Sequence, residues 1–543
     1  MSRTQTDEAM VASRTGIELT TAATVVPPDT RDSQDAPTTA PVDPPKSTTA
    51  IIITCVTCVT MIGSLLNGVV TIALPTMARD LQLQPGLLLW YKVSCPWSTT
   101  EANHPRPASI YALTCGCTLI LCGAVADIIG SRIMYLMGCL LQSAFTLACG
   151  LSKSGFQLIF FRALAGIAIS FCLPSAVSLI TTYFPHGRRR NFAFAAMGGG
   201  QPIGFSIGLT LGGVLVDGPG WRVCFYIGAA INTVVLFIAA WGLPRTKQQN
   251  SISWQRLKHE VDWTGAVILS TSLGMFSYVL AALTGSVSTI RDPSTIALLS
   301  LAAALIPLFI FWVGRQENLG RPAIIPNSLW RNKNFTSICI DVFLIWGSFN
   351  AVETLVTFYF QDVQELSATQ SSLRFLPAPV VGTLTNICIG LIVHRIRANW
   401  AVIITTAISA LAPLLIALAK PESSYWQYAF PAMALNPIGP DVLFTISNLL
   451  ISSAFPDKTQ ALAGGVFNTL AQVGKSVGLA LTAVIAGTVT LRAEHGEKPR
   501  TEPEALMEGY RAAWWFCLAI TAATLVVSTF GLRNVGKLGL KRE

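Results

Sequence analysis

Charge is scarce in this sequence: Asp, Glu, Lys and Arg make up 12% of the 543 residues, whereas hydrophobic residues make up 52%. So low a charge content favours a membrane-embedded protein over a soluble one. A phosphate-binding motif of the form Gly-x-x-x-x-Gly-Lys-Ser/Thr is missing, which argues against an ATP-driven machine. The five histidines fall in predicted loops or at the ends of apolar segments, so we expect no enzymatic site, no metal site and no cofactor.

Long apolar segments fill the chain from about residue 49 to residue 532. A helix needs roughly 20 apolar residues to cross a hydrocarbon core roughly 30 Å thick. Fourteen segments meet this requirement, which predicts an all-α membrane protein with fourteen transmembrane helices in a lipid bilayer. The predicted spans are approximately 50–77, 107–127, 131–151, 156–183, 191–216, 221–243, 262–284, 294–314, 335–361, 371–394, 398–419, 425–454, 460–489 and 511–532.

Lys and Arg concentrate in alternate loops and in the C-terminal tail, for example at 188–190 and 533–542. The positive-inside rule therefore predicts a multi-pass protein with both termini cytoplasmic, and we expect it in the plasma membrane. This distribution also accounts for the net charge of +9 and leaves no concentrated patch for a nucleic acid. All cysteines except Cys95 fall inside predicted spans, where a free thiol behaves as a small apolar side chain.

An internal repeat divides the spans into two sets. Residues 203–211 match residues 473–481, and 179–185 match 450–456 at almost the same offset. Two parallel six-helix repeats are typical of transporters whose substrate site lies between the halves. The predicted organisation is a disordered tail at 1–48, a first six-helix half at 49–243, a linker with two inserted helices at 244–334, a second six-helix half at 335–532 and a basic tail at 533–543.

The loop between the second and third spans contains Gly123, Asp127, Gly130 and Arg132. This spacing resembles the signature of the major facilitator superfamily, which implies the major facilitator fold. The glycine permits close helix packing, and the carboxylate can accept hydrogen bonds from a basic side chain or a helix N-terminus. Such a latch can form and break as the two halves rock. Ile128 stands where the family has its first basic residue, so we expect a weaker latch.

The corresponding loop of the second half departs further from the signature. Gly390 is followed by His394 and Arg395, with no aspartate. An ordinary charged turn is the alternative interpretation of both loops.

The fifth span carries Gly200, Gly204, Gly208 and Gly212 at four-residue spacing, which forms one flat stripe for close helix packing. The stripe resembles the glycine-rich fifth-helix motif of exporters and antiporters in the superfamily. Leu209 follows Gly208 where that motif has proline, so the implied kink is in question while the packing face is retained. Packing alone is the competing explanation.

Ionisable residues inside spans are costly in lipid and usually face a partner or a cavity. Arg162 resembles the family's fourth-helix arginine. Asp441 and Lys475 lie on consecutive spans and could form a buried pair, either structural or functional. Asp341 and Glu353 share one span but lie roughly 18 Å apart along it, so they cannot touch. Asp341 is then either an interfacial cap or a pathway residue.

Further polar positions link the chain to one branch of the superfamily. Asn67 in the first span lies close to where bacterial fourteen-span exporters place an aspartate, and the string from Trp346 to Asn350 resembles a fungal subgroup. That subgroup belongs to the fungal fourteen-spanner, drug:proton antiporter-like branch and includes aminotriazole-resistance, boron-efflux and low-affinity ammonium transport proteins. The resemblance implies a monomeric secondary transporter of a small-molecule substrate, with protons as the coupling ion.

Efflux of a drug-like molecule, toxic solute or secondary metabolite is the predicted direction. Uptake of ammonium or another small metabolite is the alternative, and a non-transporting receptor is a third class. Because the first span lacks an acid, we assign proton handling to Asp441 first and Glu353 second. A permanent structural bridge to Lys475, or coupling through Arg162 and Asp127, are the competing hypotheses.

Residues 91–106 interrupt the pattern with Pro, Trp, His and charges but no periodicity. We hypothesise an unspliced in-frame intron in the gene model, against a genuine long loop. Sequencing of the transcript decides between them, and reads that contain the insert would exclude the intron.

Overall fold

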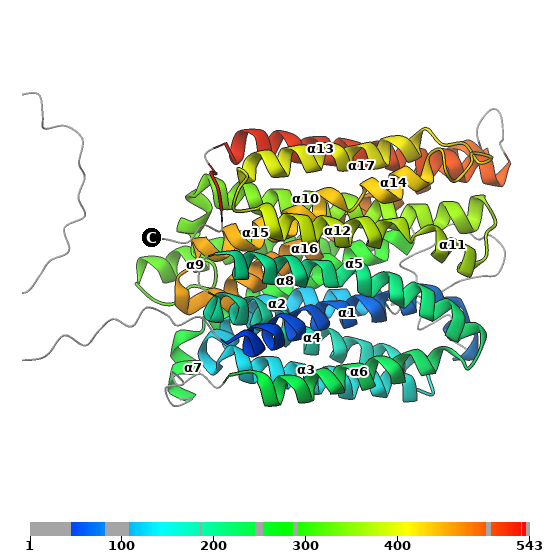
Figure 1. Ribbon diagram of the computed structural model, residues 1–543. Coiled ribbons are helices and arrows are strands. Elements are labelled where there is room, and N and C mark those ends of the chain that lie inside the picture. The colour runs from blue at the N-terminus through cyan, green and yellow to red at the C-terminus, as the bar shows by residue number, and fades with distance from the viewer. Residues whose placement is uncertain are drawn as a thin grey trace, which may run out of the picture. The chain divides into compact units, whose positions relative to one another are not determined.

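The computed structural model describes residues 45–81, 108–184, 187–244, 254–285, 292–495, 501–533 and 535–538. The interrupting segment 91–106 and nearly all of the tail 1–48 lie outside these residues. Fourteen helices of the described part are long and apolar enough to cross a membrane, which confirms the predicted number of spans. The helices run side by side in one bundle (Figure 1). We call the end of the bundle that holds Lys46 and Leu532 the terminal side, and the other end the opposite side.

The first half contains six long helices. Helix α1 begins at Lys46, so the last residues assigned to the disordered tail already belong to a helix. Within this half α1 packs on α5 and α6, and α4 packs on α2 and α3. The bounds are α1 (Lys46–Asp80), α2 (Ala108–Ile129), α3 (Ser131–Leu151), α4 (Gly155–Tyr183), α5 (Arg188–Asp217) and α6 (Trp221–Gly242).

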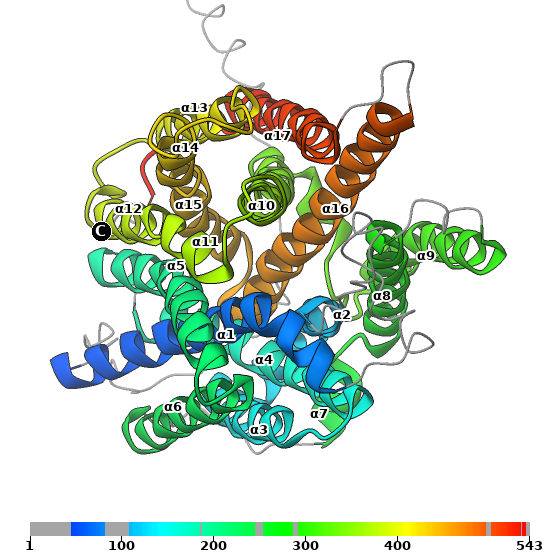
Figure 2. The same cartoon turned by 90° about the vertical axis from the view of Figure 1, so that its right-hand side faces the viewer.

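Three helices connect the halves: the short α7 (Trp254–Glu260), and the inserted pair α8 (Trp263–Gly285) and α9 (Pro293–Asn318). Helix α8 packs on α9, α2 and α16, and the pair lies at the periphery of the bundle (Figure 2). Asp262 holds the pair together, because its Oδ1 accepts hydrogen bonds from the backbone of Gly265 at 2.8 Å and from Trp312 Nε1 at 2.9 Å.

The second half repeats the arrangement with more interruptions. Its elements are η3 (Asn327–Arg331), α10 (Lys333–Phe358), the π-helical turn η4 (Tyr359–Val363), α11 (Ala368–Arg374), α12 (Pro377–Ile392), α13 (Ala398–Ala417), α14 (Ala429–Leu435), α15 (Ile438–Ala454), η5 (Asp457–Thr459), α16 (Gln460–His495) and α17 (Glu502–Gly531). Two spans predicted as continuous are broken, at 375–376 and at 436–437. Proline follows each break or lies in it, and it cannot donate a backbone hydrogen bond.

The internal repeat of the sequence is also a repeat of packing. Gly204 and Gly208 in α5 lie so close to α1 that a Cβ atom on either would overlap a carbonyl oxygen of α1. Their repeats, Gly474 and Gly478 in α16, lie equally close to carbonyl oxygens of α10. Glycine stripes permit this approach of two backbones inside a membrane. The pairs α1–α5 and α10–α16 are therefore equivalent, as two parallel halves require.

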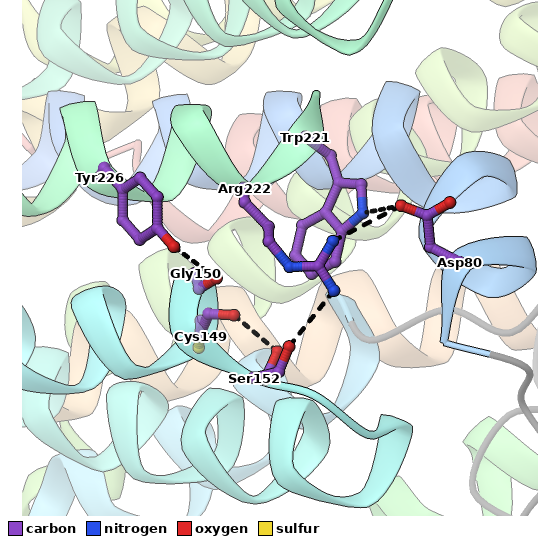
Figure 3. Close-up of polar contacts among 7 residues, drawn as sticks. All are labelled: Asp80, Cys149, Gly150, Ser152, Trp221, Arg222 and Tyr226. Carbon is purple, nitrogen blue, oxygen red and sulfur yellow. Dashed lines mark hydrogen bonds and ion pairs between the residues drawn. The ribbon is translucent and has the colours of Figure 1, made fainter. Parts of the chain in front are cut away.

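Polar contacts tie the first half together on the opposite side (Figure 3). Asp80, at the end of α1, accepts a hydrogen bond from Trp221 Nε1 at 3.0 Å and lies 3.5 Å from Arg222. The guanidinium group of Arg222 covers the Trp221 ring at 4.4 Å and donates to the carbonyl oxygen of Ser152 between α3 and α4. These contacts join α1, α6 and the α3–α4 connection at one end of the first half.

Candidate functional site

A cavity of about 420 Å³ lies between the two halves. Helices α1, α2 and α5 of the first half and α10, α12, α15 and α16 of the second half line it, and the inserted helix α8 contributes Ser277 and Leu280. Its walls combine ionisable groups with aromatic rings. The ionisable groups are Glu353, Asp362, Asp441 and Lys475, and the aromatic ones are Tyr111, Phe205, Trp346, Phe349, Phe358, Phe375 and Phe444.

One face of α10 supplies a large part of the cavity wall. Trp346, Asn350 and Glu353 are spaced by four and three residues, so all three point from the same face of the helix, and all three line the cavity. Trp346 is also held by ring contacts with Phe444 of α15 at 6.3 Å and Phe467 of α16 at 5.9 Å. Three helices of the second half thus fix the position of this indole.

Glu353, Asp441 and Lys475 meet in this cavity from three different helices. Lys475 and Glu353 interact electrostatically, and Glu353 is also a like-charge neighbour of Asp441. Neither Asp441 nor Glu353 lies within ion-pair distance of Lys475 in the described part of the chain, so the buried pair between Asp441 and Lys475 that the sequence suggested does not form there. The charge of Lys475 acts on Glu353 of α10 at longer range, across the cavity that both residues line.

Asp441 lies where the two halves meet. It occupies the first turn of α15, just after the break at Pro437, and its Oδ2 atom is buried without a hydrogen-bond partner. A Cβ atom on Gly382 of α12 would lie 2.7 Å from that oxygen and 3.3 Å from Pro202 of α5. Glycine at position 382 therefore makes room for the carboxylate beside a residue of the other half. Any separation of the halves changes the surroundings of Asp441.

Arg162 and Asn67 form the polar part of the first half. Arg162 is 1% exposed, and its Nη2 atom donates to Asn67 Oδ1 at 3.3 Å. Its guanidinium group also lies over the ring of Tyr111, 4.8 Å from the centroid. Asn67 and Tyr111 line the cavity, and Arg162 lies directly behind them.

Asp341 lies away from the other ionisable groups of the spans. It is fully buried and accepts a hydrogen bond from Ser528 Oγ of α17 at 2.8 Å. It is not among the cavity-lining residues of the described part. This contact within the second half favours a packing role over the pathway role that we considered for it.

The signature stretch joins the two halves on the terminal side. Asp127 Oδ1 accepts a hydrogen bond from the backbone of Ala461 at 2.8 Å, and Oδ2 accepts one from Leu462 at 2.9 Å. The carboxylate therefore caps the N-terminus of α16, the second of the two partners that the sequence allowed. Gly123 permits the approach, because a Cβ atom there would lie 2.8 Å from the carbonyl oxygen of Ala461.

The other two signature residues act inside the first half. Gly130 forms the turn between α2 and α3 with a φ of 103°, which favours glycine. Arg132 donates to the carbonyl oxygens of Leu243 at 3.0 Å and Ala240 at 2.8 Å, at the end of α6. A cation at a helix C-terminus is stabilised by the exposed carbonyl groups.

Arg190 makes a second contact between the halves that sequence reasoning missed. It is 4% exposed, and its Nη2 atom donates to Ser452 Oγ of α15 at 2.7 Å. In the repeat, Arg190 corresponds to Gln460, and Gln460 Nε2 donates to the carbonyl oxygen of the same Ser452 at 3.0 Å. Extending the repeat to the first turn of each helix would have revealed this equivalence. In the sequence, Arg190 stands out only as one of the basic residues at 188–190 that indicate the topology.

The halves are in tight contact on the terminal side. Besides these hydrogen bonds, Gly464 packs on Val177 and Gly390 on Ala195 at distances that leave no room for a Cβ atom. The cavity instead extends toward the opposite side, where Gln361 and Asp362 line it. The structure thus has a closed terminal side.

The structure has two equivalent helical halves with a charged cavity between them, among the membrane-spanning helices. This arrangement is that of a membrane transporter. A sequence model of the Major Facilitator Superfamily matches residues 56–479. The chain belongs to this superfamily.

Several known proteins resemble the chain. MFS-type transporter 1 of Pyricularia oryzae is 41% identical over 535 residues, which cover 90% of this chain and 84% of that protein. The low affinity ammonium transporter of Saccharomyces cerevisiae is 25% identical, with coverage of 78% and 81%. Efflux pump terJ of Aspergillus terreus is 24% identical, with coverage of 77% and 78%.

Among solved structures, the human organic anion transporter MFSD10 superposes with a TM-score of 0.64 over 89% of this chain and 100% of that one. At 13% sequence identity, this likeness shows the fold alone. The fold and the superfamily predicted from the sequence are confirmed.

Proposed function

We propose that this superfamily transporter is a proton-coupled exporter of a small drug-like molecule, toxic solute or secondary metabolite. One observation carries the proposal: Glu353 and Asp441 line the same cavity as a set of aromatic rings. Carboxylates within spans are costly and mark proton or substrate pathways. A proton and a solute can therefore compete for one site, which antiport requires.

Rocking of the halves would link this competition to transport. Asp441 lies beside Pro202 of the other half, and Glu353 interacts with Lys475. Movement of one half relative to the other changes the contacts of Asp441 and the water access of both acids. The two acids would then differ in protonation between states that face opposite sides.

The outward direction is supported by the names of two relatives and by the glycine stripe of α5. One relative is the efflux pump of Aspergillus terreus, and another is the aminotriazole resistance protein of Saccharomyces cerevisiae, 23% identical with coverage of 77% and 74%. The ammonium transporter among the relatives favours uptake as the second candidate.

We place the protein in the plasma membrane as a monomer with both termini cytoplasmic, so that the terminal side is the cytoplasmic side.

The test uses the full chain in proteoliposomes that contain a pH-sensitive dye. A panel of cationic and neutral amphiphiles, and ammonium, is added under an imposed pH gradient. Exchange predicts that solute entry drives protons out and that collapse of the gradient stops uphill transport. Solute and protons moving in the same direction would contradict antiport, and transport of ammonium alone would favour the uptake carrier.

Variants identify the coupling group. Asp441→Asn and Glu353→Gln should abolish uphill transport but retain downhill counterflow, because each removes an acid that takes up protons and keeps the shape of the side chain. Lys475→Ala should change the pH dependence of transport, because Glu353 loses its cation. Asp341→Asn is the matched control: Ser528 can still donate to the amide oxygen, so coupling should persist. If the first two variants keep uphill transport with unchanged pH dependence, coupling resides elsewhere.

A further inference from the structure

A second cavity of about 790 Å³ lies on the terminal side, between the first turns of α1 and α5 and the end of α12. Four basic side chains line it: Lys46, Arg188, Arg189 and Arg395. No carboxylate is among its lining residues in the described part. We call this cavity the basic groove. Helix α5 lies between α1 and α12 in both views of the bundle (Figures 1 and 2).

The repeat shows which group the basic groove lacks. In the first half, Gly123 packs on α16 and Asp127 caps the N-terminus of that helix. In the second half, Gly390 packs on α5, but His394 replaces the aspartate and accepts a hydrogen bond from Arg188 Nε at 3.3 Å. The N-terminus of α5 therefore meets positive side chains where the N-terminus of α16 meets a carboxylate.

His394 lies in a region of positive potential, between Arg188 and Arg395. Partial burial, Arg188 and Arg395 all lower the pKa of His394 below its usual value. Its Nδ1 atom is buried without a hydrogen-bond partner. A negatively charged group in the basic groove would offset this positive potential and the positive end of the α5 dipole.

The basic groove is also apolar along its outer edge. Phe192, Leu391 and Ile392 line it and are 41%, 57% and 42% exposed. They follow the basic residues along α5 and precede Arg395 after α12, so they occupy the membrane-spanning part of these helices. An occupant with an anionic head and a hydrocarbon body matches both parts.

We propose that the basic groove binds a phospholipid with an anionic headgroup, whose phosphate takes the place that a carboxylate holds in the first half. Basic pockets between transmembrane helices on one side of a membrane are suited to anionic headgroups. Arg188 belongs to the first half and Arg395 to the second, so the phosphate bridges the halves. Without it, closure of the terminal side brings like charges together. The bound lipid therefore stabilises the closed terminal side, together with the contact of Asp127.

The test titrates phosphatidylserine, or phosphatidylcholine as the zwitterionic reference, onto the full-length protein in detergent. Native mass spectrometry counts bound lipids, and thermal denaturation measures stability. Each basic residue is worth roughly fivefold in affinity for an anionic headgroup. The double variant Arg188→Gln, Arg395→Gln should therefore lose affinity roughly 25-fold and lose the stabilisation by phosphatidylserine.

Two controls separate binding from folding. Arg331→Gln with Lys333→Gln removes the same charge beside the start of α10, outside the basic groove, and should bind like the wild type. Arg188→Lys with Arg395→Lys keeps the charge and should retain most of the affinity. Equal affinity of the glutamine double variant and the wild type would refute the proposal.

A gain-of-function variant provides an independent test. His394→Asp introduces the carboxylate that the first half has at the equivalent place. The variant should be stabilised without lipid and should bind phosphatidylserine more weakly, because the anion site is occupied. Unchanged lipid affinity in this variant would contradict the assignment.

Other occupants give distinguishable results. If sn-glycerol 3-phosphate stabilises the protein as much as phosphatidylserine does, the basic groove binds a free phosphate group, and the proposal of a lipid is refuted. If the wild type binds the two lipids equally, and a variant without residues 1–44 binds phosphatidylserine more tightly, the acidic N-terminal tail occupies the basic groove. That result would also refute a lipid as the occupant. Neither result depends on transport, so the proposed export function is tested separately.

Discussion

The hydrogen bonds of Asp127 to the first turn of α16 should control the balance between closed and open forms of the terminal side. Asp127 lies in the first half, and its partners Ala461 and Leu462 lie in the second, at 2.8 Å and 2.9 Å. The first amide groups of a helix have no partner within that helix. These bonds therefore exist only while the halves are in contact, and they stabilise the closed form alone.

The effect of Asp127→Asn can be estimated from this geometry. Hydrogen bonds to a charged group contribute about 1.5–3 kcal/mol each, and a negative charge at a helix N-terminus contributes about 0.3–1 kcal/mol. Asparagine keeps one acceptor oxygen but loses the charge and the second acceptor. The closed form should lose about 2–3 kcal/mol relative to the open form, which shifts their ratio roughly 30- to 150-fold.

Hydrogen–deuterium exchange of the peptide that begins α16 measures this shift directly, because Asp127 accepts from the amides of that turn. Exchange there should accelerate by the same factor in Asp127→Asn. The matched control is Asp262→Asn, where the carboxylate makes a similar cap inside the inserted pair. It should accelerate exchange in α8 and leave α16 unchanged. If exchange at the start of α16 is the same in Asp127→Asn and wild type, the latch does not hold the halves.

Two further results are expected from packing. Gly208→Ala should destabilise the protein by about 1–3 kcal/mol in thermal denaturation, because its Cβ would overlap the carbonyl oxygen of Leu65. Gly213→Ala in the same helix should be nearly neutral, because its Cβ would lie 3.5 Å from the nearest atom, Thr369 Oγ1. Equal destabilisation by the two substitutions would contradict this explanation. Asp80→Asn should lower the free energy of unfolding by at most about 1 kcal/mol, because the partly exposed ion pair is weak and the indole of Trp221 can still donate. Trp221→Ala, which removes a buried ring, should lower it by about 3–5 kcal/mol. A larger loss in Asp80→Asn than in Trp221→Ala would show that charge rather than packing stabilises the opposite side of the first half.

Several features followed from the sequence because they depend on local properties of the chain. Apolar length determines a membrane span, and all fourteen predicted spans have a matching helix. The repeat of Gly204 and Gly208 as Gly474 and Gly478 indicated two equivalent halves, since small residues at fixed spacing specify close packing wherever they occur. The spacing of the signature also indicated that Asp127 can cap a helix, although Asp127 lies in the last turn of α2 and not in the loop that the sequence predicted.

The partners of the ionisable groups could not be derived in the same way. Asp441 and Lys475 lie on consecutive spans, yet Lys475 interacts with Glu353 from a distant span, and Asp341 bonds to Ser528 of the last span. Which side chains meet depends on the rotation and tilt of each helix. Packing between segments hundreds of residues apart sets both, so only the tertiary structure decided the composition of the site.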